Sequence, residues 1–222
     1  VNMSLGGPGN ADSDTALLAD KIMDNNIFIA IAAGNSGGSP GRGTIGQPGS
    51  SRKALTVAAM DKRNSIASFS SRGPALDKTG AKIDKPDMTG YGVNIYSLRD
   101  PASNRPVDKI YKGPKGETVE YTKMSGTSMA TPDLLGKFAL LYQAALDALH
   151  EIGASLPTAF ADKIKHYAMA VVAEKGNLNF HKHEQGVGGL TKEAMLVLAK
   201  EIPEHIKKGH DLPVTIIEDK GA

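Results

Sequence analysis

The stretch IFIAIAAGN, Ile27 to Asn35, decides the fold. Its first seven residues are apolar and rich in β-branched side chains, which is typical of a strand buried on both faces of a sheet. The same signature returns in ALTVAAM, Ala54 to Met60. A helix predicted to begin at Asp12 or Ser13 and to end near Asn25 precedes the first strand. This order of elements predicts an α/β fold with a parallel sheet flanked by helices.

The chain has 222 residues, which is the length of one large domain. We expect this domain to span residues 1–202 and a C-terminal tail to span residues 203–222. Apolar stretches at Ile66 to Ser70 and Val93 to Leu98 predict further strands. The segment from Arg99 to Lys123 is rich in Pro, Gly and Lys, and it predicts an excursion over the surface.

The C-terminal third is predominantly helical in pattern, and the tail contains the short apolar run VTII, Val214 to Ile217. The predicted helices are Leu134 to Leu149, Pro157 to Ala173 and Lys192 to Ile202. At the other end, Val1 opens on NMSLGG, the end of a predicted strand, with no signal peptide before it. We therefore expect a fragment or a processed chain.

Composition excludes several classes of protein. With 40% hydrophobic and 23% charged residues, the chain has the make-up of a globular protein with a sizeable core. No apolar run approaches the ~18 residues of a membrane span, so no membrane partner is expected. The net charge is +2 and no basic stripe is present, which argues against a nucleic-acid partner. The absence of cysteine excludes disulfides, thiol catalysis and Cys-ligated zinc.

The segment MSGTSMATP, Met124 to Pro132, is the first candidate for chemistry. A turn of small residues that leads into a helix places Ser128 at or beside the helix N-terminus. There, free backbone N–H groups and the helix dipole favour negative charge. This is a suitable setting for a nucleophile. The segment alone is equally compatible with Ser and Thr acting only as helix caps.

A second candidate is AAGN, Ala32 to Asn35, where a predicted buried strand ends in Gly-Asn. In a parallel α/β sheet the carboxyl ends of the strands are where ligands bind. A side-chain amide at that edge can donate a hydrogen bond to a developing oxyanion. Taken alone, Gly-Asn after a strand more often marks an ordinary turn. SLGG, Ser4 to Gly7, would similarly be an ordinary exit from a strand.

Together, these segments resemble the subtilisin-like serine proteases, the subtilase family. The similarity rests on GTSMATP around Ser128, AAGN and SLGG, with the connecting blocks IGQPGS, SFSSRGP and KPDMTGYGVNI. In order and spacing it covers about Val1 to Leu149, and GVGGLTKEA, Gly186 to Ala194, is a weaker match. The resemblance implies the C-terminal part of a subtilase catalytic domain, whose fold is incomplete because the N-terminal part is missing.

Residue by residue, the resemblance implies that Ser128 is the nucleophile and that Asn35 is the side-chain donor of the oxyanion hole. It further implies that an edge segment pairs with the main chain of a polypeptide substrate, and that small residues form a roomy, mainly apolar pocket for large uncharged side chains. The residues implied to bind substrate are Ser4, Leu5, Gly6, Ala32, Ala33, Gly34 and Gly46.

Three departures from the family pattern stand out. Asp133 replaces the usual His after the Pro, and MTGYG, Met88 to Gly92, lacks the usual Ala-Pro-Gly. The third departure is the largest, because the family's Asp and His motifs, which precede the Ser along the chain, are not found. All six histidines follow Ser128; they are His150, His166, His181, His183, His205 and His210.

Three hypotheses follow. The favoured one is a serine endopeptidase whose Asp and His lie on an N-terminal segment of the same protease. The alternative is a catalytically inactive pseudoprotease or peptide-binding module that keeps the cleft. The third is an unrelated hydrolase that recruits one of the C-terminal histidines, which the family's chain order opposes.

Metal sites are weakly indicated. His181, His183 and Glu184 could bind a metal, although their spacing is more typical of a polar loop. No cofactor is expected to be required. The resemblance implies one weak structural calcium site at Asp77 and the loop Gly49 to Ala54, and it favours an extracellular location.

Overall fold

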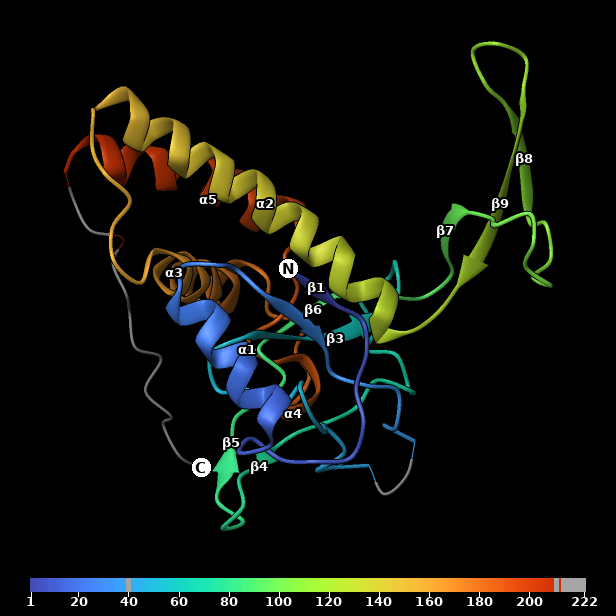
Figure 1. Ribbon diagram of the computed structural model, residues 1–222, viewed down its shortest axis with the longest axis horizontal. Helices are drawn as coiled ribbons and strands as arrows, with labels where there is room; N and C mark the ends of the chain where they lie inside the picture. Colours follow the sequence, from blue (N-terminus) through green and yellow to red (C-terminus); the bar gives the residue numbers. More distant parts are fainter. Residues whose placement is uncertain (39–40, 210–211, 213–222) are drawn as a thin grey trace.

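The computed structural model describes residues 1–38, 41–209 and 212. A four-stranded, all-parallel sheet in the order β1-β2-β3-β6 forms its centre (Figure 1). These strands are β1 Asn2–Met3, β2 Ala30–Ala32, β3 Leu55–Met60 and β6 Met88–Tyr91. The predicted α/β fold with a parallel sheet is confirmed.

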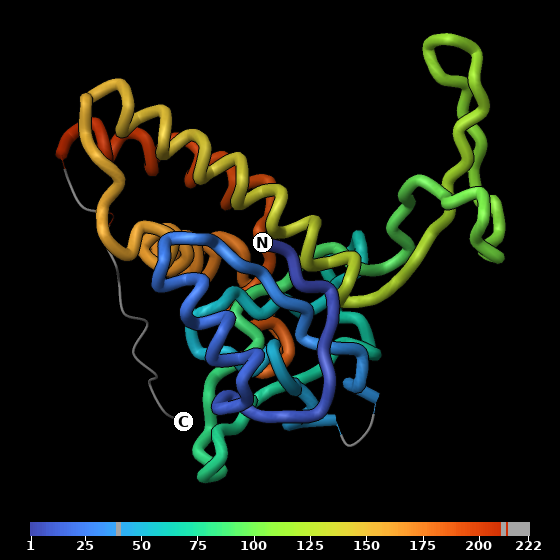
Figure 2. The backbone as a smooth tube through the Cα atoms, viewed as in Figure 1, coloured from blue at the N-terminus to red at the C-terminus, as the bar shows by residue number. Residues whose placement is uncertain are grey.

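Helices cover both faces of this sheet. They are α1 Asp14–Asp24, α2 Thr127–Glu151, α3 Phe160–Lys175, α4 Lys182–Gln185 and α5 Lys192–Lys207. The long helix α2 runs across β2, β3 and β6 and lies against α5 (Figures 1 and 2). On the opposite face, Met23 of α1 packs against Ile29 and Ile31. Because both faces are covered, all six residues of β3 are buried, as its continuous apolar sequence predicts.

Strand boundaries differ from the sequence predictions. The strand predicted over residues 27–33 is reduced to β2, and the side chain of Ile27 is 49% exposed. The prediction of a strand over residues 66–70 is wrong. The chain turns back at Asp61 to Ser65, and Ile66 makes only an isolated bridge to Met60. Here the hydroxyl of Ser70 accepts a hydrogen bond from the backbone N–H of Ala59, so the segment covers the end of β3 instead of extending the sheet.

The segment after β6 leaves the body of the molecule. Strand β7 Ile95–Leu98 forms, but it pairs with β9 Thr118–Met124 in a separate antiparallel sheet of order β7-β9-β8, with β8 Lys109–Lys112 on its outside. The surface excursion predicted over residues 99–123 is therefore an ordered β-arm, which projects away from the central sheet (Figure 1). A short hairpin of β4 Ala75–Leu76 and β5 Lys82–Ile83 lies elsewhere on the surface.

The predicted helices are all present with shifted ends. Helix α2 begins at Thr127 instead of Leu134 and passes through Pro132, and α3 and α5 each extend to a lysine, Lys175 and Lys207. The predicted tail thus starts within α5, and its VTII run lies outside the described residues. Within the described part of the chain, no helix has the length and apolar character needed to cross a membrane.

A buried ion pair anchors the strand β6 to its neighbours. Lys85, 1% exposed, donates from Nζ to the carbonyl of Ala54 at 2.8 Å and to Oδ2 of Asp87 at 2.5 Å. The same carboxylate accepts the backbone N–H of Thr56 at 2.6 Å. Burial lowers the pKa of Lys85, and the Asp87 carboxylate opposes that shift. The pair therefore satisfies backbone groups at the entry to β3.

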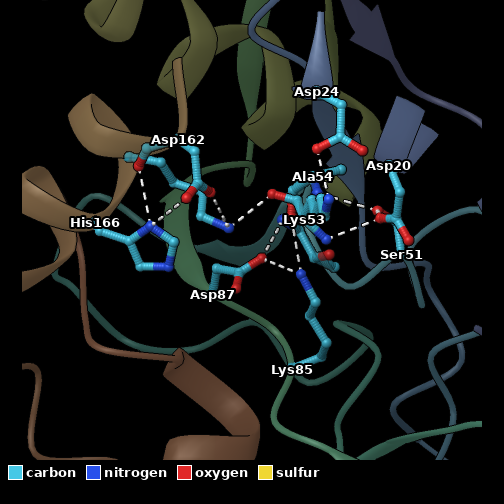
Figure 3. Close-up of polar contacts among 11 residues, drawn as sticks. Asp20, Asp24, Ser51, Lys53, Ala54, Lys85, Asp87, Asp162 and His166 are labelled. Atoms are coloured by element: carbon cyan, nitrogen blue, oxygen red, sulfur yellow. Dashed lines mark hydrogen bonds and ion pairs between the residues drawn. The ribbon is translucent and has the colours of Figure 1, made fainter. Parts of the chain in front are cut away.

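Two further side chains bind the same stretch of chain (Figure 3). Asp20 of α1 accepts hydrogen bonds from the hydroxyl of Ser51 and the backbone N–H of Lys53. Lys165 of α3 donates to the carbonyl of Lys53 at 2.6 Å. Helices α1 and α3 are thus hydrogen-bonded to the loop that enters β3, and this loop sets the position of the central strand.

We expect Lys85→Met to lower the free energy of unfolding by about 3–5 kcal/mol, because it leaves the Asp87 carboxylate buried without its counter-charge. Urea denaturation followed by circular dichroism measures the change. Lys82→Met, at an exposed position of strand β5, is the matched control, with an expected change within about 0.5 kcal/mol. Equal urea midpoints for the two variants would contradict a stabilising role of the pair.

Candidate active site

The start of α2 is held against the sheet by close backbone contacts. Gly126, directly before the helix, donates its N–H to the carbonyl of Gly92 at 2.8 Å. A Cβ on Gly92 would lie 2.6 Å from the carbonyl oxygen of Gly126, and one on Gly90 would lie 2.5 Å from that of Ala130. The MTGYG segment, which departs from the family pattern, is strand β6 and the residue after it. Its glycines therefore permit the helix to approach the sheet.

Ser128 is the second residue of α2. Its backbone N–H is one of the first N–H groups of the helix, which have no partner within the helix. Its hydroxyl donates to the carbonyl of Ser4 at 3.3 Å. The carbonyl of Ser128 would normally accept from the residue four positions later, but Pro132 has no N–H. The hydroxyl of Ser4 donates to it instead at 2.8 Å, which binds the edge segment to Ser128.

Asn35 faces the helix N-terminus with a fixed amide orientation. The backbone N–H and the hydroxyl of Thr127 both donate to its Oδ1, at 2.9 and 3.0 Å. A backbone N–H can only donate, so the amide atom that faces it must be the oxygen. The Nδ2 group is left on the opposite side and, among the described residues, has no hydrogen-bond acceptor. Nδ2 of Asn35 and the backbone N of Ser128 both lie next to Gly126, 3.4 and 3.7 Å from where a Cβ on that glycine would stand.

The predicted site residues line one cavity of about 620 Å³. No described residue that lines this cavity carries an ionisable side chain, which fits a pocket for uncharged groups. Leu5 is 57% exposed on the segment that follows the edge strand β1. The predicted residues brought together here are Ser4, Leu5, Gly6, Ala32, Ala33, Gly34, Asn35, Gly46 and Ser128.

At two positions that line the cavity, the structure explains why the residue is glycine. Gly46 lies so close to the edge segment that a Cβ would be 2.1 Å from the carbonyl oxygen of Gly7. Gly34 has φ +102°, a backbone conformation that favours glycine. Its carbonyl accepts from the N–H of Ser71, and the hydroxyl of Ser71 accepts from the N–H of Ser36. The turn that carries Asn35 is therefore fixed on both sides.

Thr127 and Ser71 are positioning residues that sequence reasoning missed. Thr127 lies inside the quoted GTSMATP segment, and Ser71 lies inside SFSSRGP. Both are short hydroxyl side chains beside glycine turns, a residue type that commonly binds neighbouring backbone. The partners of these hydroxyls are distant in sequence, so only the fold identifies them.

Asp133, which stands where the family usually has His, makes two hydrogen bonds that fix its side chain. Its Oδ2 accepts the backbone N–H of Tyr91 at 3.1 Å and pairs with Lys137 at 2.8 Å. Asp133 is the seventh residue of α2 and lies beyond its first turn, so these two contacts and not the helix dipole account for the carboxylate. Asp133 therefore connects the helix to β6, and its contacts are with Tyr91 and Lys137 and not with the Ser128 hydroxyl.

No described histidine binds the Ser128 hydroxyl. His166 pairs with Asp162, and His183 pairs with Asp84 at 3.2 Å. His181 caps α4 by accepting the N–H of His183. Among the described residues, no group of three or more His, Cys, Asp or Glu could hold a metal ion. The stretch from His181 to Glu184 is thus organised by hydrogen bonds as a polar turn.

The model of the subtilase family matches residues 1–188. Over 155 residues the chain is 41% identical to the serine protease AprX of Bacillus subtilis, covering 64% of this chain and 33% of AprX. It is 36% identical over 143 residues to subtilisin DY of Bacillus licheniformis, covering 64% of this chain and 41% of that protein. The chain thus spans about a third of the first of these relatives.

Solved structures show the same fold. The prenylagaramide maturation protease PagA matches with a TM-score of 0.56 and 23% identity, over 90% of this chain and 61% of that chain. Proteases from Pseudoalteromonas arctica match with a TM-score of 0.59 and 21% identity, over 90% of this chain and 50% of that chain. With the family model covering most of the sequence, the chain belongs to the subtilase family.

Proposed function

We propose that this chain supplies the nucleophile and the oxyanion hole of a serine endopeptidase. The observation that carries the proposal is the amide of Asn35. Thr127 holds its oxygen, and its Nδ2 lies on the same side of Gly126 as the backbone N of Ser128. Donors fixed before the reaction stabilise charge that develops on a carbonyl oxygen without reorganising during the step.

In the proposed reaction, the Ser128 hydroxyl attacks the scissile carbonyl and its proton passes to a general base. The oxygen that becomes negative is bound by Nδ2 of Asn35 and the backbone N–H of Ser128. The protonated base then gives its proton to the leaving nitrogen, and collapse of the tetrahedral intermediate breaks the C–N bond, releases the amine and leaves an acyl-enzyme on Ser128, which water then hydrolyses. The extended segment Ser4 to Gly6 pairs with the substrate main chain, and the uncharged cavity receives a large neutral side chain.

The general base and its Asp partner are proposed to lie on an upstream segment of the same protease. Ser128 donates to the Ser4 carbonyl, an arrangement that leaves its hydroxyl unactivated. His150 lies at the other end of α2, ~33 Å along the helix axis from Ser128 at 1.5 Å per residue. This distance, and the separate partners of His166 and His183, argue against an unrelated hydrolase built on the C-terminal histidines.

The alternative is a pseudoprotease or peptide-binding module with the same cleft. The sequence upstream of Val1 in the intact protein distinguishes the two. Motifs that carry both the Asp and the His favour the endopeptidase, whereas their replacement favours the binding module.

The residues at the proposed calcium site do not fit a bound ion. Oδ1 of Asp77 accepts three hydrogen bonds from Thr79 and Ala81, and these lower the pKa of Asp77, the Thr79 hydroxyl contributing most. Arg52 lies 3.7 Å from the other carboxylate oxygen and also pairs with Asp12. A guanidinium therefore supplies the positive charge there, and no step of the proposed reaction uses calcium.

Once the upstream segment is supplied, we expect a fluorophosphonate probe to label Ser128, because among the described serines only this one combines the helix N-terminus with the Asn35 amide. Mass spectrometry of tryptic peptides locates the label. Ser128→Ala should abolish labelling, and Ser125→Ala, three residues away, is the control that should retain it. A label at another residue, or one that persists in Ser128→Ala, would remove the assignment.

Asn35→Ala in the completed enzyme should lower kcat while KM changes little, because the amide acts mainly when charge develops on the oxygen. The loss measured for the corresponding donor in subtilisin is ~10²–10³-fold, and we expect a loss of that order. Steady-state kinetics on a peptide amide give both constants. Unchanged kcat would exclude Asn35 from the oxyanion hole.

The 222 residues alone should show little or no hydrolysis of peptide amides, because a serine hydroxyl is a poor nucleophile without an adjacent base. A chromogenic peptide amide, assayed before and after addition of the upstream segment, measures the difference. Robust hydrolysis by the isolated chain that is lost on replacing one histidine would instead support the unrelated hydrolase.

A further inference from the structure

The β-arm, residues 95–124, carries an unusual amount of exposed apolar surface. Five large apolar or aromatic side chains of the arm are at least 38% exposed: Tyr96, Leu98, Val107, Ile110 and Tyr111. The four residues of the outer strand β8 are all exposed. Both apolar side chains of β8, Ile110 and Tyr111, are more than half exposed and are therefore available to a partner.

The arm is nevertheless well ordered by its own contacts. Arg99 pairs with Glu120 at 2.9 Å and also donates to the carbonyls of Ser103 and Arg105. Lys109 lies over the ring of Tyr96 at 4.0 Å from its centroid. The ring centroids of Tyr111 and Tyr121 are 5.2 Å apart in an edge-to-face arrangement. A partner would therefore meet a preformed surface and would not have to order it.

Strand β8 leaves one edge open, because the sheet order is β7-β9-β8. Its sequence is Lys-Ile-Tyr-Lys, residues 109–112. An open edge binds an extended polypeptide through main-chain hydrogen bonds, and neighbouring side chains then select the sequence. Each face of β8 offers one lysine and one apolar side chain, Lys109 with Tyr111 and Ile110 with Lys112.

The charges on this edge select the partner. Among the described residues, no ion pair involves Lys109, Lys112 or Lys115. Of the acidic groups of the arm, Glu120 and Asp108 pair with Arg99 and Lys123, and Asp100 and Glu117 accept the backbone N–H groups of Ala102 and Lys115. A second copy of the chain that paired antiparallel with β8 would bring like charges together, which is unfavourable. A strand with carboxylates at both ends and apolar residues between them is complementary to β8.

We propose that β8 is an exosite that binds extended segments of polypeptide substrates with the pattern acidic–apolar–apolar–acidic. The arm returns to the body at Met124, four residues before Ser128, and Ser125 at this root accepts the N–H of Asn94. The exosite thus belongs to the segment that leads directly into α2, and it lies on an arm that projects away from the central sheet (Figure 1). That its occupant is a substrate rests on the proposed endopeptidase function, whereas binding itself needs no chemistry at Ser128.

The test is fluorescence anisotropy of the 222-residue chain with a fluorescein-labelled peptide built around EVVE, compared with the same peptide carrying KVVK. We expect saturable binding of EVVE, at least tenfold weaker binding of KVVK, and loss of affinity at high salt. The double variant Lys109→Glu/Lys112→Glu should bind EVVE at least tenfold more weakly and should gain affinity for KVVK. Lys62→Glu/Lys200→Glu, which changes two exposed lysines outside the arm, is the control with the same net charge and should bind like the parent.

A second pair of variants tests the apolar contact. Ile110→Ser should weaken EVVE binding, and Leu140→Ser, at a similarly exposed position on α2, should not; the two side chains are 60% and 67% exposed. The exosite is overturned by any of three results: no binding of EVVE, equal losses in arm and control variants, or a two-chain mass in sedimentation equilibrium. If the chain binds EVVE but Ser128 is not labelled after the upstream segment has been added, the endopeptidase proposal is rejected and the exosite proposal is retained.

Discussion

The hydrogen bonds from Thr127 to the amide oxygen of Asn35 are the constraint on which the site depends. They join the first residue of α2 to the turn after β2, two elements that are separated by more than ninety residues along the chain. The helix can reach this turn because Gly90 and Gly92 carry no side chain where its backbone passes. Ser4 then closes the arrangement by hydrogen bonding to the carbonyl that Pro132 leaves without a partner. The GTSMATP segment is thus held by β1, β2 and β6 together.

Much of this could be predicted from the sequence, because the signals are local. Continuous apolar β-branched runs identify β2 and β3, and small residues before a helix identify the setting of Ser128. Sequence reasoning failed where tertiary pairing decides. Residues 66–70 have the composition of a strand, but Ser70 binds the backbone of β3 and turns the segment away from the sheet. Similarly, the sequence predicts a helix that begins at Leu134, after Pro132, but α2 begins at Thr127. The residues before Pro132 are helical because the hydroxyl of Ser4 satisfies the carbonyl of Ser128, which Pro132 cannot.

The polar groups buried beneath the sheet were also beyond sequence reasoning. Lys85 reads as an ordinary surface lysine of a Lys-Pro-Asp turn, yet it is fully enclosed and binds the carbonyl of Ala54. A periodicity argument treats charged residues as exposed, and it has no means of finding a charge that satisfies backbone groups. In the β-arm, sequence reasoning instead missed regular structure. Its polar composition indicates loop, whereas cross-strand aromatic and ion pairs give it a regular structure.

In the proposed endopeptidase, charge stabilisation and proton transfer would depend on separate parts of the protein. The donors that would stabilise an oxyanion are a backbone N–H and a neutral amide, whose positions depend on hydrogen bonds made within the 222 residues. They do not depend on the charge of any nearby group, since no described residue that lines the cavity is ionisable. Proton transfer, by contrast, needs a base that contacts the Ser128 hydroxyl, and that hydroxyl is bonded to a carbonyl. In subtilisin, binding and the oxyanion hole alone retain about 10³–10⁴-fold acceleration when the triad is removed. In the proposed enzyme, a base from an upstream segment would therefore add proton transfer without rebuilding the donors, because hydrogen bonds made within this chain already hold them.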